Sequence, residues 1–379
     1  MLLNRIEMPE SKFILEVRKM KKILFVLVVL LIGTEQALAL DYAITGLGTL
    51  GGDRSWARSI NDSGQVVGSS EVDSNLSYPP IHAFLYDGET MYDIGTLGGS
   101  GSHHARGVNN NGLIVGSSKT LGYEHAFLYD STGMTDLGTL GGNLSGAAGI
   151  NNTGHVVGTS RLSGGTGDGT NTHAFLYDGI SMHDLGTLGG TYSAAFAIND
   201  GGQVVGYSKV AGDTALHAYL YDGTSMTDLG TLGGTHSVAN DINNNGQVVG
   251  DSHITGDTAR HAYLYDGISM NDLGTLGGSS SYAHGINDNG QVVGYSYIDG
   301  TSVQHAFIYD STDGMVDLNN LLPSGSGWLL EQAYDINSSG QIVGRGTING
   351  YDQAFLITPV PEPCGLMLLG LGGLLIRKR

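Results

Sequence analysis

The sequence is poor in cysteine, which excludes stabilisation of the fold by disulfides within the chain. Its one cysteine, Cys364, lies near the C-terminus, so no disulfide can form within the chain. Charged residues are also scarce, at 14%, whereas glycine is abundant, with 62 residues. Such a composition would indicate disorder if it were aperiodic. The glycines instead recur at fixed positions between short apolar runs, which is typical of a β-repeat protein.

Basic residues are nearly absent from the middle of the chain. Of the 17 Lys and Arg residues, nine lie in the two terminal segments, so eight remain in residues 40–358. The same segment holds 31 of the 36 acidic residues, which gives it a net charge of about −23. A surface of that charge repels phosphate backbones, so we expect no nucleic-acid partner. Cations and neutral polymers stay open as partners.

A unit of about 44 residues, a length typical of propeller blades, fills residues 41–358 and occurs seven times. Three landmarks give this count independently. His-Ala-Phe or His-Ala-Tyr begins at His82, His125, His173, His217, His261 and His305, with a Gln-Ala-Phe variant at Gln353. Ile-Asn-x-x-Gly begins at Ile60, Val108, Ile150, Ile198, Ile242, Ile286 and Ile336. Thr-Leu-Gly-Gly begins at Thr49, Thr96, Thr139, Thr187, Thr231 and Thr275, and its seventh copy is degenerate at residues 317–321.

Each unit predicts four short strands. These are His-Ala-Phe-Leu-Tyr-Asp, Met-x-Asp-Leu-Gly-Thr-Leu, Ser-x-Ala-x-x-Ile-Asn and Gln-Val-Val-Gly-x-Ser, joined by Asp-Gly, Gly-Gly and Asn-x-x-Gly turns. Such short antiparallel strands cannot protect their edges singly, whereas radial closure protects them. We therefore predict an all-β fold, a seven-bladed β-propeller over residues 40–358, with an open β-solenoid as the alternative.

One alanine in each unit lies three residues before the Ile or Val of the second landmark. A small residue at every copy indicates a place where neighbouring sheets approach closely. These residues are Ala57, Ala105, Ala147, Ala195, Ala239, Ala283 and Ala333.

The two ends of the repeat region predict ring closure. The region begins with a second-strand sequence, residues 42–50, and ends with an unpartnered first strand, residues 353–357. We expect these strands to pair and complete one shared blade, with Leu356 near Ile44 and Ala354 near Leu47.

The N-terminus is typical of a secretory signal peptide. Met20-Lys21-Lys22 precedes an apolar run over residues 23–32, and Ala37-Leu38-Ala39 has the small-x-small pattern of a cleavage site. We therefore interpret residues 20–39 as the signal peptide, with the mature chain starting near Leu40, and residues 1–19 as a doubtful upstream extension. An uncleaved anchor is the alternative, although the apolar run is short for a membrane span.

The C-terminal residues 359–379 form a three-part segment. Val360-Pro361-Glu362-Pro363 is followed by an apolar run over residues 364–376 and by Arg377-Lys378-Arg379. The prolines favour an extended peptide, and the run with its basic end is typical of a short membrane segment with a cytoplasmic positive end. Cys364 is either a lipidation site or a small apolar residue lost with the tail.

This three-part order resembles the PEP-CTERM sorting signal of Gram-negative, biofilm-forming bacteria. The resemblance implies transient anchoring in the inner membrane, processing by an exosortase, which is a membrane cysteine transpeptidase, and release or transfer to the cell surface. The repeats resemble the HAF family of extracellular repeats, named for the His-Ala-Phe triplet. That second resemblance implies a place outside the cell, and it implies no particular activity.

Two motifs suggest metal binding, and each has a simpler interpretation. The six repeated histidines occupy one equivalent position per unit, which favours a structural hydrogen bond to a turn over a metal ring, and no His-x-x-x-His pair occurs. Residues 241–246 match the start of a calcium loop, but Ser252 stands where the twelfth-position Glu is expected. We expect a plain turn there, and we assign no metal, cofactor or catalytic residue.

Positions that break the repeat are the candidates for recognition, and they include no nucleophile–base signature and no acid pair. The variable segments 71–81 and 161–172 fall on the face of the Gly-Gly turns, where recognition loops are expected. We expect a non-enzymatic surface protein that binds surface material such as exopolysaccharide, with Trp56, Tyr192, Tyr282 and Trp328 as stacking platforms. The alternatives are a propeller enzyme that cleaves polysaccharide or peptide, using Glu331 or His104, and a structural spacer.

Overall fold

The structure is a computed structural model, and it describes residues 41–164, 171–300 and 302–360. The signal peptide, the upstream extension and the sorting-signal residues Pro361, Glu362, Pro363, Arg377, Lys378 and Arg379 lie outside the described residues. Within the described part of the chain, no helix has the length and apolar character needed to cross a bilayer.

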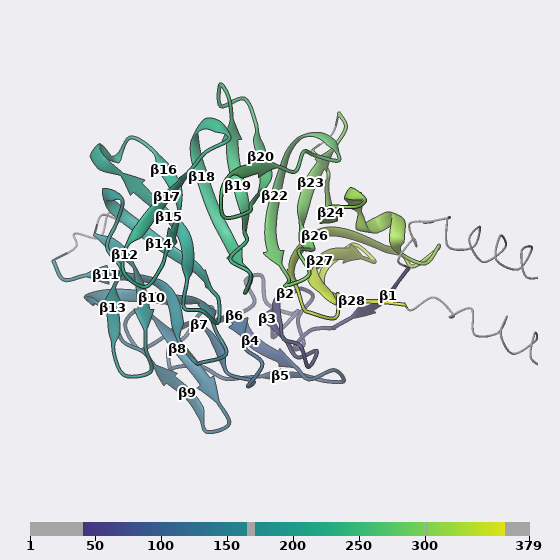
Figure 1. Cartoon of the computed structure of the whole chain (residues 1–379). Helices are drawn as coiled ribbons and strands as arrows, with labels where there is room; N and C mark the ends of the chain where they lie inside the picture. The colour runs from purple at the N-terminus through teal and green to yellow at the C-terminus, as the bar shows by residue number, and fades with distance from the viewer. Residues whose placement is uncertain (1–40, 165–170, 301, 361–379) are drawn as a thin grey trace, which may run out of the picture. The chain divides into compact units, whose positions relative to one another are not determined.

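The repeat region forms 28 short strands, shown in Figure 1. Four strands make one blade, and the Ser-x-Ala-x-x-Ile strand is the innermost. The inner strands are β2 (Ser55–Ile60), β6 (His104–Val108), β10 (Gly141–Ile150), β14 (Gly189–Ile198), β18 (Gly233–Ile242), β22 (Gly277–Ile286) and β26 (Trp328–Ile336). The second strands are β3 (Val66–Glu71), β7 (Ile114–Lys119), β11 (Val156–Leu162), β15 (Val204–Val210), β19 (Val248–Ile254), β23 (Val292–Ile298) and β27 (Ile342–Ile348).

The two outer positions of each blade hold the His-Ala-Phe strand and the Met-x-Asp strand. The third strands are β4 (Ile81–Tyr86), β8 (Glu124–Asp130), β12 (Thr172–Tyr177), β16 (Leu216–Tyr221), β20 (Arg260–Tyr265), β24 (Gln304–Asp310) and β28 (Tyr351–Pro359). The outermost strands are β5 (Met91–Asp93), β9 (Gly133–Asp136), β13 (Met182–Asp184), β17 (Met226–Gly230), β21 (Met270–Asp272), β25 (Gly314–Asp317) and β1 (Tyr42–Gly46).

The sheet pairings confirm the seven-bladed β-propeller. Five blades are separate four-stranded antiparallel sheets, and the blades of β10–β13 and β14–β17 are joined by one parallel pair, Thr172 with Tyr192. Two short 3₁₀ helices interrupt the pattern, η1 (Ala211–Asp213) and η2 (Leu318–Leu321). The second replaces the degenerate seventh Thr-Leu-Gly-Gly landmark.

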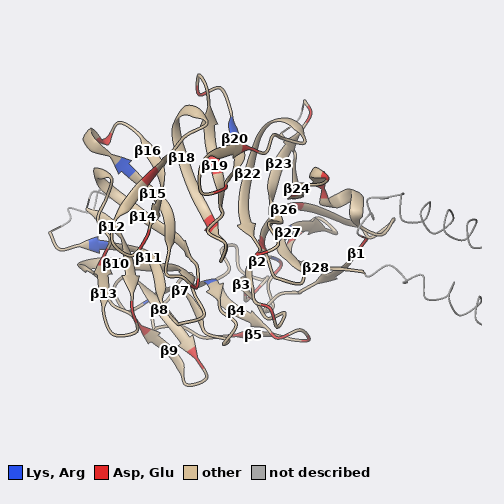
Figure 2. Cartoon of the chain, in the orientation of Figure 1, with Lys and Arg blue, Asp and Glu red and all other residues tan. Residues whose placement is uncertain are grey.

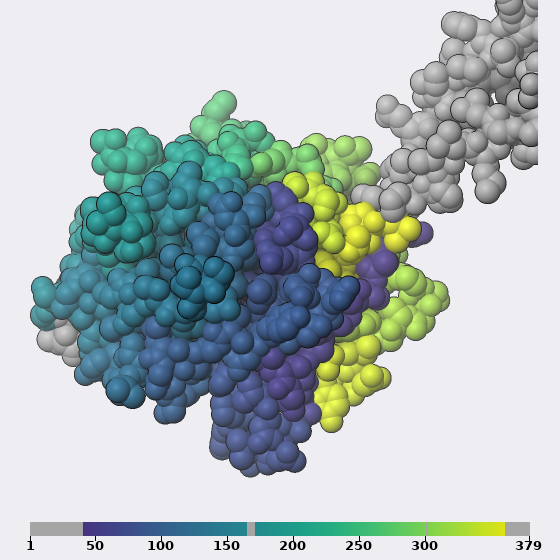
Figure 3. Space-filling view, turned by 90° about the horizontal axis from the view of Figure 1, so that it is seen from below, coloured from purple at the N-terminus to yellow at the C-terminus, as the bar shows by residue number. Residues whose placement is uncertain are grey.

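The predicted closure is confirmed, with a correction to its register. Strand β1 is the outermost strand of the last blade and pairs antiparallel with β28. The amide of Leu47 donates to the carbonyl oxygen of Ala354 at 3.0 Å, as expected. Leu356 lies opposite Thr45, one residue from the expected Ile44, which lies opposite Ile357. Figure 3 shows the first described residues, in purple, against the last, in yellow.

The core lies between neighbouring blades. Each repeated alanine is fully buried or nearly so and packs on residues of the preceding blade, as Ala57 does on Val343 and Ala354. The aromatic residue of each His-Ala-Phe triplet is also fully buried. The glycine of Val-Val-Gly has to be glycine, because a Cβ atom on Gly158 would lie 2.0 Å from the carbonyl oxygen of Gly146. The close sheet contacts that the alanines predicted are therefore present.

Candidate functional site

A ring of asparagine side chains surrounds one end of the propeller channel, where it lines a cavity of about 190 Å³. Asn61 donates its side-chain amide to the carbonyl oxygen of Asn109 at 3.0 Å, and Asn109 donates in the same way to Asn151 at 2.9 Å. The remaining bonds continue through Asn199, Asn243, Asn287 and Asn337 and return to Asn61. Each of these asparagines is buried, so the ring locks the seven inner strands together.

The asparagine of the Ile-Asn landmark thus has two functions, of which the sequence indicated only one. Its side-chain oxygen accepts from the amide two or four residues later, as Asn199 accepts from Gln203 at 3.0 Å, which forms the expected turn. Its side-chain amide forms the ring. Asn243, within the calcium-like motif, makes the same bonds as its equivalents. Among the described residues, no group of three or more His, Cys, Asp or Glu could hold a metal ion.

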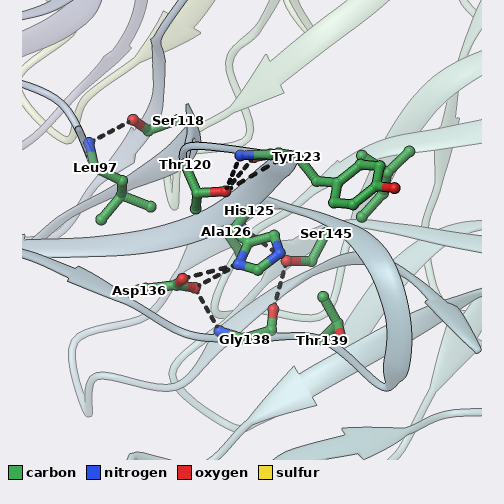
Figure 4. A network of polar contacts seen from close by, with 12 residues as sticks. Leu97, Ser118, Thr120, Tyr123, His125, Ala126, Asp136, Gly138, Thr139 and Ser145 are labelled. Carbon is green, nitrogen blue, oxygen red and sulfur yellow. Dashed lines mark hydrogen bonds and ion pairs between the residues drawn. The ribbon is translucent and has the colours of Figure 1, made fainter. Parts of the chain in front are cut away.

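The repeated histidines bind an aspartate of the neighbouring outer strand. In all six blades that contain it, the His Nδ1 atom lies 2.6 to 2.8 Å from an Asp carboxylate. Figure 4 shows the pair His125 and Asp136, where Asp136 also accepts from the amide of Gly138. Ser145 of the next blade accepts from the amide of Ala126 in the same network. The histidine is therefore structural, as the sequence favoured, although its partner is a carboxylate.

The last blade lacks both members of this pair. Gln353 takes the histidine position in β28, and Gly46 takes the aspartate position in β1. The indole ring of Trp328 fills the space, because a Cβ atom on Gly46 would lie 2.9 Å from it. Trp328 also meets Phe355 edge-on, at 6.4 Å between ring centroids. Loss of the pair and gain of a packed tryptophan thus coincide where the ring closes.

Every inner strand carries a β-bulge immediately after its repeated alanine. In β2, Ala57 lies opposite Gly68 and Ser59 opposite Val67, so Arg58 is the extra residue. The same shift occurs in the other six inner strands. A bulge redirects the side chain of its extra residue. The seven extra residues are Arg58, Arg106, Ala148, Phe196, Asn240, His284 and Tyr334.

All seven bulged residues line one chamber in the channel, with a volume of about 260 Å³. A second cavity of about 440 Å³ shares Arg106, Ala148 and Phe196 with it and adds Tyr192 and Tyr207. The alanine before each bulge is repeated, whereas the bulged residues range from arginine to phenylalanine. The chamber is therefore the place where a sevenfold framework carries a single asymmetric set of side chains, and it is our candidate site.

Two arginines of adjacent blades give the chamber its basic character. Among the described residues, neither Arg58 nor Arg106 forms an ion pair or a hydrogen bond, and Arg58 lies 4.2 Å from the centroid of the Tyr334 ring. The Arg106 side chain is accessible to solvent, and desolvation in the channel followed by the charge of Arg58 lowers its pKa against the opposing charge of Glu124. Burial and the Arg58 charge also lower the pKa of His284 to about 4, so its imidazole is neutral at physiological pH.

Two aspartates also line the chamber, and both are bound by backbone amides. Asp241 accepts from Ile242 at 2.8 Å and from Ile286 of the next blade at 2.9 Å. Asp335 accepts likewise from Ile336 and Ile60. Burial, followed by repulsion from Asp335, raises the pKa of Asp241 to about 8, and burial also raises the pKa of Asp335. At neutral pH these carboxyl groups therefore carry less negative charge than their number indicates.

The four aromatic residues predicted to bind ligand do not share one site. Tyr192 lines the second cavity and stacks on Tyr207, with ring centroids 5.7 Å apart. The partly exposed rings of Trp56 and Tyr282 lie on other blades, where Tyr282 stacks on Tyr295 at 4.7 Å. Trp328 is packed against Phe355, as described above. Their role in binding stays a prediction.

The residues considered for an enzyme are engaged in separate contacts. His104 Nδ1 lies 2.9 Å from the hydroxyl of Ser69, which is only 4% exposed, and Glu331 accepts from the hydroxyl of Thr347 at 3.1 Å. The sequence pattern assigned no function to any chamber residue, although Arg58 and Arg106 visibly depart from the repeat. Phe196, Asn240, His284 and Tyr334 were missed. Variation at one repeat position was the available signal.

Comparison with known families places a recognised domain over the second half of the propeller. The family described as "Protein of unknown function (DUF3466)" matches residues 181–276 and 271–358. The chain contains a DUF3466 domain. The description of this family assigns it no activity, and no curated protein matches the chain.

Solved structures support the fold alone. The chain is similar to the β-propeller domain of the trilobed protease from Pyrococcus furiosus, with 10% identity, a TM-score of 0.50, and coverage of 80% of this chain and 95% of that domain. It is also similar to TolB from Acinetobacter baumannii, with 16% identity, a TM-score of 0.47 and coverage of 67% of this chain. The chain spans 62% of the length of that TolB structure.

Proposed function

We propose that this DUF3466-containing propeller is a binding protein of the cell surface or extracellular matrix, and that it holds its ligand in the channel chamber without catalysing a reaction. The observation that carries the proposal is the set of seven bulged residues. A purely structural role would be met by the same small residue at the bulge of every blade. The chamber instead presents two cations, two aromatic rings, an imidazole and an amide. Convergent polar groups beside apolar walls are typical of ligand sites.

Export to the surface is supported by the two ends of the sequence. The signal-peptide pattern and the resemblance of residues 359–379 to a PEP-CTERM signal favour secretion, exosortase processing and surface attachment in a Gram-negative host. Replacing Pro361, Glu362 and Pro363 by alanine in the host tests this route. We expect the variant to accumulate in the inner-membrane fraction, and an unchanged surface fraction would contradict it.

A surface polysaccharide is the ligand class that the chamber favours. Phe196 and Tyr334 are partly exposed rings that a sugar can contact, although Arg58 covers one face of Tyr334, and Tyr192 extends this surface into the second cavity. Trp56, Tyr282 and Trp328 stay as candidates for further contacts along a polymer.

The direct test measures binding of the polysaccharide fraction from the host matrix to the immobilised protein. We expect Phe196→Ala and Tyr334→Ala to weaken binding at least tenfold. Ile180→Ala is the matched control, because Ile180 is 88% exposed at an Asp-Gly turn and contributes nothing to the chamber. Unchanged binding by both chamber variants would overturn the proposal.

The same incubation tests the enzyme alternative. We expect the polymer to keep its length, as measured by size-exclusion chromatography. Shortening of the polymer that stops in Glu331→Gln or His104→Ala would show instead that the protein is an enzyme.

A further inference from the structure

We infer that the chamber recognises a negatively charged group of its ligand, a carboxylate or phosphate on a sugar unit, and that Arg58 and Arg106 bind it together. The inference rests on the proposed function and deepens it by naming the ligand chemistry. The positive site is local, within a propeller surface that is otherwise acidic.

Unpaired positive charge is placed in the chamber of a protein that has little positive charge. The propeller has eight basic residues for 31 acidic ones, and Figure 2 shows how sparse the basic residues are. Four of the eight form ion pairs with acidic residues, namely Arg54, Lys209, Arg260 and Arg345. Arg58 and Arg106 form none among the described residues, although carboxylates are abundant. Both side chains are accessible to solvent in the chamber, so two guanidinium groups without a carboxylate partner are available to one bound anion.

The two arginines of the chamber repel each other. Arg58 and Arg106 occupy the same bulged position of neighbouring inner strands, and the charge of Arg58 contributes to lowering the pKa of Arg106 and of His284. Arrangements of like charges that destabilise the free protein are common at functional sites. An oxyanion between the two groups removes the repulsion and accepts charge-assisted hydrogen bonds from both.

The residues around the two arginines are compatible with a bound anion. The Nε2 atom of His284 is buried and has no hydrogen-bond partner in the described part of the chain. The side-chain amide of Asn240 donates to the carbonyl oxygen of Ala283 at 2.8 Å, so it is part of the chamber wall and not a free donor. Arg106 and Arg161 both line the adjoining cavity, which also contains Glu124. Asp241 and Asp335 oppose an anion, but backbone amides satisfy their oxygens and burial favours their protonated forms.

The aromatic residues in the chamber wall favour a negatively charged sugar, in preference to a free inorganic anion. Phe196 and Tyr334 belong to the same chamber as the arginines, so one ligand unit can stack on a ring and place its charged group between the guanidinium groups. The uniform negative charge outside the chamber slows approach of a polyanion at low salt, and we expect moderate salt to speed association.

The test is titration calorimetry of the full-length chain with trigalacturonate, with its neutral methyl ester and with inorganic phosphate. We expect wild-type protein to bind trigalacturonate at least tenfold more tightly than the ester. Arg58→Gln and Arg106→Gln should each weaken the binding of trigalacturonate at least tenfold and leave the ester unchanged. Lys119→Gln is the control, because it removes one positive charge outside the chamber. Phosphate binding that depends on both arginines and exceeds trigalacturonate binding would support the oxyanion site and identify phosphate as the source.

Thermal unfolding distinguishes a folding defect from a binding defect. Because each arginine is repelled by the other, we expect Arg58→Gln and Arg106→Gln to unfold at the same or a higher temperature than wild type. Trigalacturonate should raise the wild-type unfolding temperature and leave that of the variants unchanged. Equal binding of acid and ester by wild type and both variants would overturn the inference and leave the proposed binding function intact. Absence of binding to trigalacturonate and phosphate would also overturn it, while neutral polysaccharides would still test the proposed function.

Discussion

Asn337 donates its side-chain amide to the carbonyl oxygen of Asn61 at 3.1 Å, across 276 positions of sequence. This bond completes the asparagine ring between the last and first blades. Strand pairing of β1 with β28 closes the propeller at its rim, and the asparagine bond closes it at the channel. The two closures therefore lie at opposite edges of the last blade, one at the outermost strand β1 and one beside the innermost strand β26.

We expect Asn337→Ala to lower the free energy of unfolding by about 1–3 kcal/mol, because it leaves the amide of Gln341 without its partner and leaves the carbonyl of Asn61 with the amide of Gly64 alone. Urea unfolding followed by circular dichroism measures this loss. The control is Thr224→Ala at an exposed turn, which should change stability by less than about 0.5 kcal/mol. Equal midpoints for the two variants would show that the ring contributes nothing.

The register of the closing pair is testable by cross-linking. In a Cys364→Ser background, Ala43→Cys with Thr358→Cys places the two thiols on directly opposed residues. We expect this pair to oxidise and to stabilise the protein by about 2–4 kcal/mol. Ala43→Cys with Ile357→Cys shifts the pairing by one residue, so the side chains point to opposite faces of the sheet. Faster oxidation of the shifted pair would contradict the observed register.

The histidine–aspartate pairs should each contribute modestly, because their side chains are partly exposed, by 21% for His125 and 39% for Asp136. We expect His125→Gln and Asp136→Asn to cost about 0.5–1.5 kcal/mol each. The double variant should cost less than the sum, and a double-mutant cycle by thermal unfolding measures this coupling. Gln353→His in the last blade should yield no gain, since Gly46 offers no carboxylate. Strict additivity in the cycle would show that the two side chains do not interact.

Asp241 should make stability fall as pH rises. Its pKa is raised to about 8 in the folded protein, by burial and by Asp335, with a smaller contribution from Asp288. Between about pH 4 and pH 8 the unfolded chain therefore loses this proton while the folded chain keeps it, so the free energy of unfolding decreases by up to about 1.4 kcal/mol per pH unit.

We expect Asp241→Asn to make this pH dependence shallower, as measured by urea unfolding at pH 4.5, 6.0 and 7.5. Asp335→Asn should act in the same direction, because burial raises its pKa too. Asp53→Asn, at an exposed carboxylate outside the histidine–aspartate pairs, is the control. Identical slopes for wild type and both buried variants would contradict the raised pKa values.

The sequence predicted the blades and their closure because both follow from counting. Seven copies of each landmark require seven sheets, and a stray strand at each end requires a shared one. The register was predicted less well, because the two expected pairs do not belong to one ladder. In an antiparallel ladder, the residue numbers of every pair add up to the same sum. Leu47 with Ala354 satisfies the observed ladder, whereas Ile44 with Leu356 differs from it by one.

The chamber was not predicted because it depends on the bulge. Ala57 and Ile60 are three residues apart, while their partners Gly68 and Val66 are two apart, so Arg58 has no partner and is displaced toward the channel. That mismatch becomes visible only when the two strands are aligned with each other. The asparagine ring was missed for a related reason, because its bonds join residues of different repeats and leave no trace in any single one.

Strand β1 also has a consequence for synthesis. The first segment of the propeller to be translated finds its partner only in β28, the last one, and no earlier strand offers it the same ladder. A chain interrupted anywhere before Tyr351 therefore retains an unsatisfied strand at its beginning and an incomplete blade at its end. Quality-control proteases that bind extended segments would bind the unpaired strand or the incomplete blade. We therefore expect truncated copies to be degraded while intact ones survive.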